Sequence, residues 1–409
     1  MLHKLRILLL LILFSVGLPI SATMVHPASS DTLPSDTLRI SLITCAPGPD
    51  VYQIFGHSAL RVECSGVRPA DLVFNYGMFS FSDDFVFKFV KGETDYMLGA
   101  YDYRHFIVDY VMRGSSVYEQ ELNLDPAQEA ALFEALLINA MPQHRIYRYN
   151  FLFDNCATRP RDMIERTLAL GGEQIVYTAP DTLYTFRELI RTYGANYSWL
   201  TFGIDLALGR DLDRKATWHE EMFVPLILQE AFDEAVIVSQ TGEQRSVVKS
   251  STTLYDSGMI ALLPPTPWYC SPLFIMLLWL AVTLLVTLCD WRRGKVSRWY
   301  DTILNLLVFV SSLIIYFLVF VSEHPATTFN LHALWLTPLA VIPAILPYFA
   351  AMRKVVRGYY ILYLSLLALF LILVTCKVQC IDVAVLPLIA MMALRSYNYL
   401  KCTKTSQTQ

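Results

Sequence analysis

The sequence predicts an α+β domain outside the cytoplasm, followed by an α-helical membrane domain of about five spans. The chain has 409 residues, of which 55% are hydrophobic and only 17% are charged. Its mean hydropathy of +0.41 is too high for an ordinary soluble protein of this length. The apolar excess is concentrated at the far N-terminus and after residue 270. The net charge of -4, with no basic stripe in the first half, argues against a nucleic-acid partner.

The N-terminus is typical of an export signal. In residues 1–22, Lys4 and Arg6 precede a short apolar core, and Ser21 and Ala22 supply a small-residue cleavage region. An uncleaved signal anchor is the alternative. Both interpretations place the following residues outside the cytoplasm. Residues 23–37 are rich in Ser, Thr, Pro and Asp and are interpreted as a linker.

Residues 38–265 are predicted to form the soluble domain. Alternation of apolar and polar residues predicts strands, and apolar residues at helical spacing predict amphipathic helices. Asp125, Pro126 and Gln128 form a helix start with a capping box. The predicted strands are 39–44, 57–63, 72–76, 116–124 and 146–149, with a polar strand pair or loop at 238–256. The predicted helices are 83–91, 126–141, 157–170, 182–193 and 217–235.

Residues 271–395 are predicted to form the membrane domain. The predicted spans are 271–289, 302–321, 333–351, 359–375 and 380–394. Basic residues gather at 291–298, at 353–357 and in the last stretch of the chain, where Arg395, Lys401 and Lys404 lie. The positive-inside rule puts these three segments, including the tail 396–409, in the cytoplasm. The soluble domain and the loop 322–332 then share the opposite face.

The chain has eight cysteines. Cys45 and Cys64 flank the segment that carries His57, and we expect a disulfide between them in an oxidising compartment. That pairing leaves Cys156 as the odd thiol of the soluble domain. No paired C-x-x-C arrangement occurs, so the sequence predicts no metal site and no cofactor.

Cys156 is the candidate nucleophile. It lies at the start of a predicted helix, where free N–H groups and the helix dipole stabilise a thiolate. Arg159 and Arg161 are expected to add positive charge. His57 follows a glycine at the start of an apolar strand and is the candidate base; His105, His144 and His219 are weaker candidates. The alternative is that Cys156 and His57 are both structural residues.

The loop 322–332 is polar between two apolar spans. It carries His324 and Asn330, which we expect to contact a lipid headgroup or substrate on the face of the soluble domain. A solvated turn without a function is the alternative.

Two resemblances follow from these motifs. His57, followed later by Asn155-Cys156 opening a helix, resembles the circularly permuted papain-like folds, including the NlpC and lecithin–retinol acyltransferase types. More closely, the chain resembles the bacterial Lnb family of lipoprotein N-acyltransferases. The matching segments are Phe-Gly-His-Ser-Ala-Leu-Arg at 55–61, Phe-Asn-Tyr-Gly at 74–77, Tyr-Asn at 149–150, Asn-Cys-Ala-Thr-Arg-Pro-Arg-Asp at 155–162, and His324-Pro325, Asn330, Leu334-Trp335 and Pro338-Leu339.

The Lnb resemblance implies an enzyme of the bacterial inner membrane with a periplasmic papain-like domain. Its reaction would move an acyl chain from a phospholipid, through a thioester on Cys156, to the α-amine of a diacylglyceryl-cysteine lipoprotein. His57 would be the base, and Asn75 is the candidate for orienting it.

Two alternatives remain. The same Cys–His pair would serve a cell-wall peptidase or thioesterase, with water in place of the amine. A non-enzymatic membrane receptor or assembly factor with an inert papain-like domain is the other.

Overall fold

The computed structural model describes residues 37–66, 69–79, 83–258 and 264–405. The predicted signal 1–22 and all of the predicted linker except Thr37 lie outside these residues. Thr37 itself belongs to the first strand. All described residues fall in one compact unit, Thr37–Gln409.

The soluble domain is built on a seven-stranded sheet in the order β10-β5-β1-β2-β3-β4-β6. Its paired strands are antiparallel, and the strand predictions between 39 and 149 are confirmed within a few residues. The sequence patterns did not reveal β4. The strands are β1 (Thr37–Cys45), β2 (His57–Ser65), β3 (Ala70–Met78), β4 (Asp95–Asp102), β5 (Val117–Leu122), β6 (Ile146–Arg148) and β10 (Val248–Tyr255).

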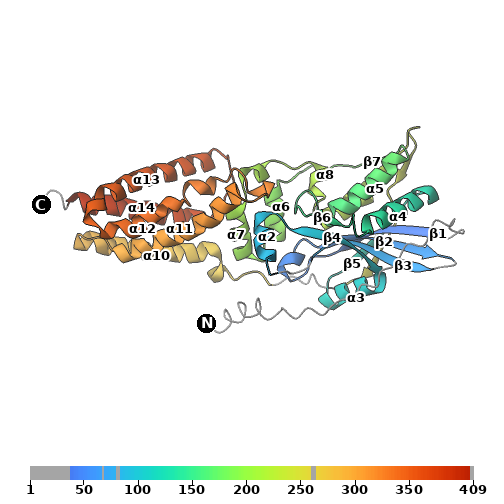
Figure 1. Cartoon of the computed structure of the whole chain (residues 1–409), viewed down its shortest axis with the longest axis horizontal. Coiled ribbons are helices and arrows are strands. Elements are labelled where there is room, and N and C mark those ends of the chain that lie inside the picture. The colour runs from blue at the N-terminus through green and yellow to red at the C-terminus, as the bar shows by residue number, and fades with distance from the viewer. Residues whose placement is uncertain (1–36, 67–68, 80–82, 259–263, 406–409) are drawn as a thin grey trace. The chain divides into compact units, whose positions relative to one another are not determined.

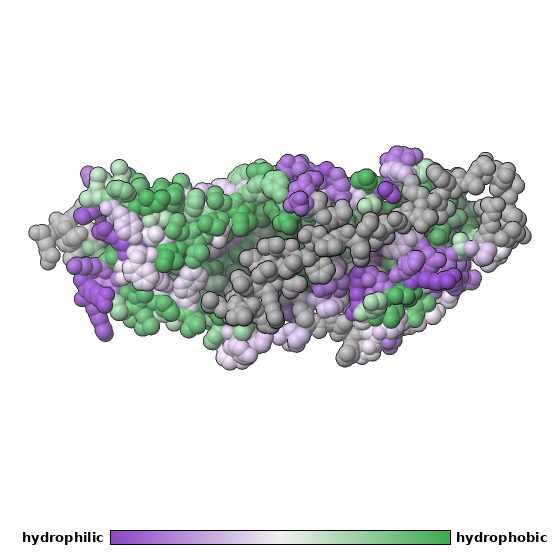
Figure 2. Space-filling model, turned by 60° about the horizontal axis from the view of Figure 1, so that its bottom comes forward, coloured by the Kyte–Doolittle hydropathy of each residue, from purple (hydrophilic) through white to green (hydrophobic). Residues whose placement is uncertain are grey.

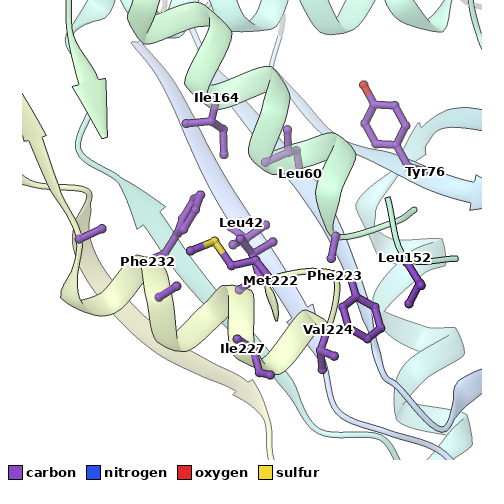
Figure 3. Close-up of a cluster of buried hydrophobic side chains, with 14 of the residues drawn as sticks. Leu42, Leu60, Tyr76, Leu152, Ile164, Met222, Phe223, Val224, Ile227 and Phe232 are labelled. Carbon is purple, nitrogen blue, oxygen red and sulfur yellow. The ribbon is translucent and has the colours of Figure 1, made fainter. Parts of the chain in front are cut away.

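Helices cover both faces of this sheet (Figure 1). The helices α4 (Pro126–Ala140), α5 (Thr158–Leu170) and α9 (Pro225–Glu234) pack on one face, and α3 (Tyr103–Arg113) packs on the other. Figure 3 shows the larger core, in which Leu42 and Leu60 of the sheet lie opposite Ile164 of α5 and Phe232 of α9. The smaller core under α3 includes Cys45 and Tyr110. The sheet is therefore buried on both faces where the site forms.

The rest of the soluble domain is mainly helical. The predicted helix 217–235 is wrong as one element: it divides into α8 (Trp218–Glu221) and α9 because Pro225 has no N–H to continue the first helix, and it begins the second instead. The other elements are α2 (Phe85–Lys91), α6 (Phe186–Tyr193), α7 (Ser198–Ala207) and a three-stranded sheet of β7 (Gln174–Val176), β8 (Val236–Val238) and β9 (Gln244–Ser246).

The membrane domain contains the long helices α10 (Pro272–Arg293), α11 (Arg298–Phe320), α13 (Arg353–Thr375) and α14 (Val385–Thr405). Among the described residues, four segments are long and apolar enough to cross a membrane: α10, α11, Leu331–Tyr348 and Ala350–Thr375. Figure 2 shows that side chains on the surface of these helices are mostly hydrophobic, as lipid contact requires.

The third predicted span is not a continuous α-helix. It consists of α12 (Val341–Ile345) and the 3₁₀ turns Leu331–Leu334, Pro338–Ala340 and Leu346–Tyr348. Three prolines, Pro338, Pro343 and Pro347, interrupt the ladder of backbone hydrogen bonds. Contacts with α11 and α13 cover this broken segment, which is the condition for irregular backbone at membrane depth.

The fifth segment also differs from its prediction. α14 begins at Val385, five residues later than expected, and extends to Thr405, within the region predicted as a tail. It packs against α10 and α13. Arg395 is only 1% exposed and bonds Asp290 of α10 and Asp301 of α11. Arg395 therefore links α14 to α10 and α11 through buried ion pairs, and it is not a free charge in the cytoplasm.

Candidate active site

The turn before α5 is fixed by the Asn155 side chain. Its Oδ1 accepts hydrogen bonds from the N–H groups of Ala157 and Thr158, at 2.8 and 3.0 Å. Its Nδ2 donates to the carbonyls of Phe151 and Phe223. Asn155 is 3% exposed, so these bonds are shielded from water. They hold Cys156 just outside the first turn of the helix, close to its free N–H groups.

Cys156 and His57 meet beside Gly77. A Cβ atom at position 77 would lie 3.5 Å from Cβ of Cys156 and 3.7 Å from Cε1 of His57. The backbone of Gly77 has φ +91°, a conformation that glycine adopts without strain. The β3–β4 register also shifts between Asn75 and Met78. This irregularity opens the sheet where α5 brings the thiol to the imidazole, and both side chains remain half-buried and reachable.

The electrostatics favour a thiolate–imidazolium pair. Burial would raise the pKa of Cys156, but the charge of His57 and a hydrogen bond from it outweigh burial and lower the pKa. The N–H groups of Ser58 and of Cys156 itself lower it further. Burial would lower the pKa of His57, but the Cys156 charge and the hydrogen bonds with Cys156 and Asn75 raise it. A charged pair of this kind is the nucleophilic form of a Cys–His site.

Asn75 bonds the far side of the imidazole. Nε2 of His57 lies 2.6 Å from Oδ1 of Asn75, and Nδ2 of Asn75 donates to the hydroxyl of Tyr101 at 2.8 Å. The ring of Tyr110 stacks on His57 at 6.1 Å between centroids. Since Nε2 faces Asn75, Nδ1 is the ring nitrogen left for the thiol. The structure thus brings the three predicted catalytic residues together, while their catalytic roles stay predictions.

The other histidines of the soluble domain have different surroundings. His105 and His144 are exposed on the surface. Nε2 of His219 lies 3.0 Å from Oε1 of Glu165. With Asp162, these two form a group that has the spacing of metal ligands. Asp162 accepts two hydrogen bonds from Arg161, and Glu165 accepts one from Tyr177, so protein groups already bond both carboxylates.

The predicted Cys45–Cys64 disulfide is wrong. In the β1–β2 ladder Cys45 pairs with His57, whereas Cys64 pairs with Leu38 near the other end. The offset from Leu38 to Cys45 corresponds to roughly 23 Å at about 3.3 Å per residue. A disulfide needs Cα atoms within about 7 Å of each other. Cys45 is instead a buried thiol in the core beneath His57.

Arg159 and Arg161 are held by neighbours. Arg159 bonds both carboxylate oxygens of Asp154, at 2.5 and 2.8 Å, and stacks on Tyr147. Arg161 bonds Asp162 and donates to the carbonyl of His219. Both guanidinium groups are thus bonded to other protein groups, and the charge that lowers the pKa of Cys156 is that of His57.

His324 and Asn330 lie where the soluble and membrane domains join. Nε2 of His324 lies 2.6 Å from the carbonyl oxygen of Phe89, and Nδ2 of Asn330 donates to the carbonyls of Leu206 and Ala207. Asn330 is buried and also accepts from Gln379. These bonds give both residues a docking role within the protein. Their predicted contact with substrate stays a prediction.

Sequence reasoning missed several residues of the site. Gly77 lies in the motif at 74–77, but only the structure shows its φ of +91° and its place beside Cys156 and His57. Asparagine is a residue type typical of helix starts, so the sequence did offer a signal for the role of Asn155. Tyr101 and Tyr110 carry no local signal, because β4 and α3 bring them to the site from the far side of the sheet.

The fold and the site define a membrane protein with several spans whose sheet-rich domain carries a Cys–His pair outside the cytoplasm. The chain belongs to the Lnb family: the Lnb N-terminal periplasmic domain matches residues 26–192, and the Lnb transmembrane domain matches residues 265–407. No curated protein and no solved structure matched the chain. The sheet-rich domain is therefore periplasmic and the helical domain spans the membrane.

Proposed function

We propose that this protein is a lipoprotein N-acyltransferase. It takes a fatty acyl chain from a phospholipid, holds it as a thioester on Cys156, and passes it to the N-terminal amine of a diacylglyceryl-cysteine lipoprotein. The observation that supports this proposal is a half-buried Cys156–His57 pair, in which each residue shifts the pKa of the other toward the charged form, in a periplasmic domain that is docked on membrane helices. Family membership supports the identity of the acceptor.

In the first half-reaction the Cys156 thiolate attacks the ester carbonyl carbon of the phospholipid. The N–H groups of Cys156 and Ser58, which already face the sulfur, stabilise the negative oxygen of the tetrahedral intermediate. The ester C–O bond then breaks. The departing lysophospholipid oxygen takes the proton from the His57 imidazolium, and a thioester and a neutral imidazole remain.

In the second half-reaction the lipoprotein amine attacks the thioester carbonyl. Neutral His57 takes a proton from the amine as the new C–N bond forms. The C–S bond breaks, an amide is released, and Cys156 leaves as a thiolate beside the imidazolium. The pair returns to its starting charge state, so the cycle is of the ping-pong type.

The orientation in the inner membrane is part of the proposal. The periplasmic domain precedes α10, and an odd number of spans puts the end of α14 in the cytoplasm. The basic segments 291–298 and 353–357 then lie on the cytoplasmic side.

Mass spectrometry of lipoprotein N-termini tests the proposal. A Cys156→Ala strain is expected to accumulate diacylated lipoproteins, and Cys376→Ala, which removes an exposed thiol, provides the control. The purified protein is expected to carry an acyl adduct on Cys156 after incubation with phospholipid. Unchanged lipoprotein acylation in the Cys156→Ala strain would refute the proposal. Release of free fatty acid with no transfer to the amine would favour a hydrolase.

A further inference from the structure

The helix α2 presents an apolar surface to its surroundings. Five of its seven residues are Phe or Val, and none of the seven is buried. Val86 is 70% exposed, Phe87 60% and Phe89 44%. Large side chains gathered in this way on one short helix indicate a surface that meets something apolar.

α2 is joined directly to the end of a membrane helix. The ring of Phe87 lies 6.0 Å from the ring of Phe317 in α11. Beyond the end of α11, Ser322 Oγ donates to the carbonyl of Val90 at 2.8 Å, and the N–H of Glu323 donates to the carbonyl of Lys91 at 2.7 Å. The carboxyl end of α2 is thus held where α11 leaves the membrane. An apolar helix at that level lies among phospholipid headgroups and the first carbons of their chains.

A row of aromatic rings leads from α2 to the site. Phe85 stacks on Phe79 at 5.1 Å, Phe79 stacks on Tyr96 at 5.0 Å, and Tyr96 stacks on Tyr149 at 4.0 Å. Phe79 comes two residues after Gly77, where an added Cβ would contact both Cys156 and His57. The rings therefore form a continuous row from the exposed helix toward the segment that lies beside the thiol.

We propose that α2 dips into the outer leaflet of the membrane and that the row of rings guides an acyl chain of the donor phospholipid to Cys156. This inference rests on the proposed function, because it concerns the route of the same acyl donor. Because α2 contacts the end of the membrane helix α11, we infer that lipid covers its apolar surface. A path of rings also suits a flexible chain that needs no hydrogen bonds.

The test compares two acyl donors on the full-length protein. One donor is a long-chain phosphatidylethanolamine in vesicles, and the other is a dihexanoyl phosphatidylethanolamine kept in free solution. The double variant Phe87→Ser, Phe89→Ser is expected to form the Cys156 adduct at least about tenfold more slowly from vesicles, because two lipid contacts are lost. It is expected to react normally with the soluble donor. Leu170→Ser, which removes a 90%-exposed apolar side chain at the end of α5, is expected to match the parent with both donors.

If the double variant forms the adduct more slowly by the same factor with both donors, the proposed route of the acyl chain is wrong. Damage to the active site would then explain the slower rate. An unchanged rate from vesicles would overturn it as well. If the parent forms no adduct with either donor, the proposed function fails and the route fails with it.

A second measurement does not depend on the reaction. The Cys156→Ala protein is placed in phosphatidylethanolamine vesicles that contain a phospholipid with a diazirine near its ester carbonyl. After illumination, peptide mass spectrometry is expected to find lipid attached to the peptide that contains α2. Lipid found only on α10–α14 would overturn the placement of α2.

Discussion

Replacing Asn75 by alanine removes the oxygen that bonds Nε2 of the His57 imidazolium at 2.6 Å. A hydrogen bond to a charged group contributes about 1.5–3 kcal/mol. The equilibrium between the charged and neutral Cys–His pair should therefore move toward the neutral pair by about 10- to 150-fold. We expect alkylation of Cys156 by iodoacetamide at neutral pH to slow by at least about tenfold.

The loss of Asn75 should also change the range of pH over which the Cys156–His57 pair is charged. Asn75 raises the pKa of His57, so its removal lets the imidazolium lose its proton at lower pH. At low pH the imidazole is protonated with or without Asn75, so the pH at which the thiolate forms beside it should stay the same. The range of pH over which the charged pair exists should therefore narrow from its alkaline side in the Asn75→Ala variant.

Peptide mass spectrometry measures alkylation cysteine by cysteine, and the exposed Cys376 provides an internal reference in every sample. Tyr101→Phe removes the acceptor for Nδ2 of Asn75 and should slow Cys156 only about two- to tenfold, because that bond is neutral. Thermal unfolding checks that the variants are folded. If Asn75→Ala keeps the parent rate and the parent pH range, Asn75 does not orient His57.

Three further outcomes follow from single contacts. Gly77→Ala should slow formation of the acyl adduct on Cys156, because a residue with a Cβ is strained at φ +91° and relief of that strain would move the backbone beside the thiol and the imidazole. Arg395→Met should lower the free energy of unfolding in detergent by about 3–5 kcal/mol, because two buried carboxylates lose their partner. Asn330→Ala should weaken the junction of the two domains, and proteolysis at the junction should become faster, because the carbonyls of Leu206 and Ala207 lose their donor.

Matched controls accompany these three changes. Gly242→Ala has a similar φ of +83° but open space around it, so it should retain the adduct. Lys354→Met removes an exposed charge and should leave stability within about 0.5 kcal/mol. Thr328→Ala alters an exposed hydroxyl of the same loop as Asn330 and should not change proteolysis. If one of these variants behaves like its control, the contact on which its expected outcome rests does not have the role proposed for it.

Much of the fold could be predicted because its determinants are local. Alternating residues in β1 and β2 predict strands, and Asp125, Pro126 and Gln128 fix the start of α4 through a capping box that the structure contains. Predictions of secondary structure were wrong where a local sequence pattern is compatible with two structures. The apolar stretch after Leu331 is long enough to span a membrane, but its prolines break it into turns.

The sequence by itself determined a periplasmic α+β domain before a membrane domain, and it singled out Cys156, His57 and Asn75 as a candidate site. Those conclusions depend on composition, periodicity and motifs, which are properties of neighbouring residues. Only the tertiary structure decided that Cys45 and Cys64 lie apart, because strand register fixes which residues face each other. It also decided that Arg395 is buried and that α2 joins α11, because both depend on contacts between residues far apart in the chain.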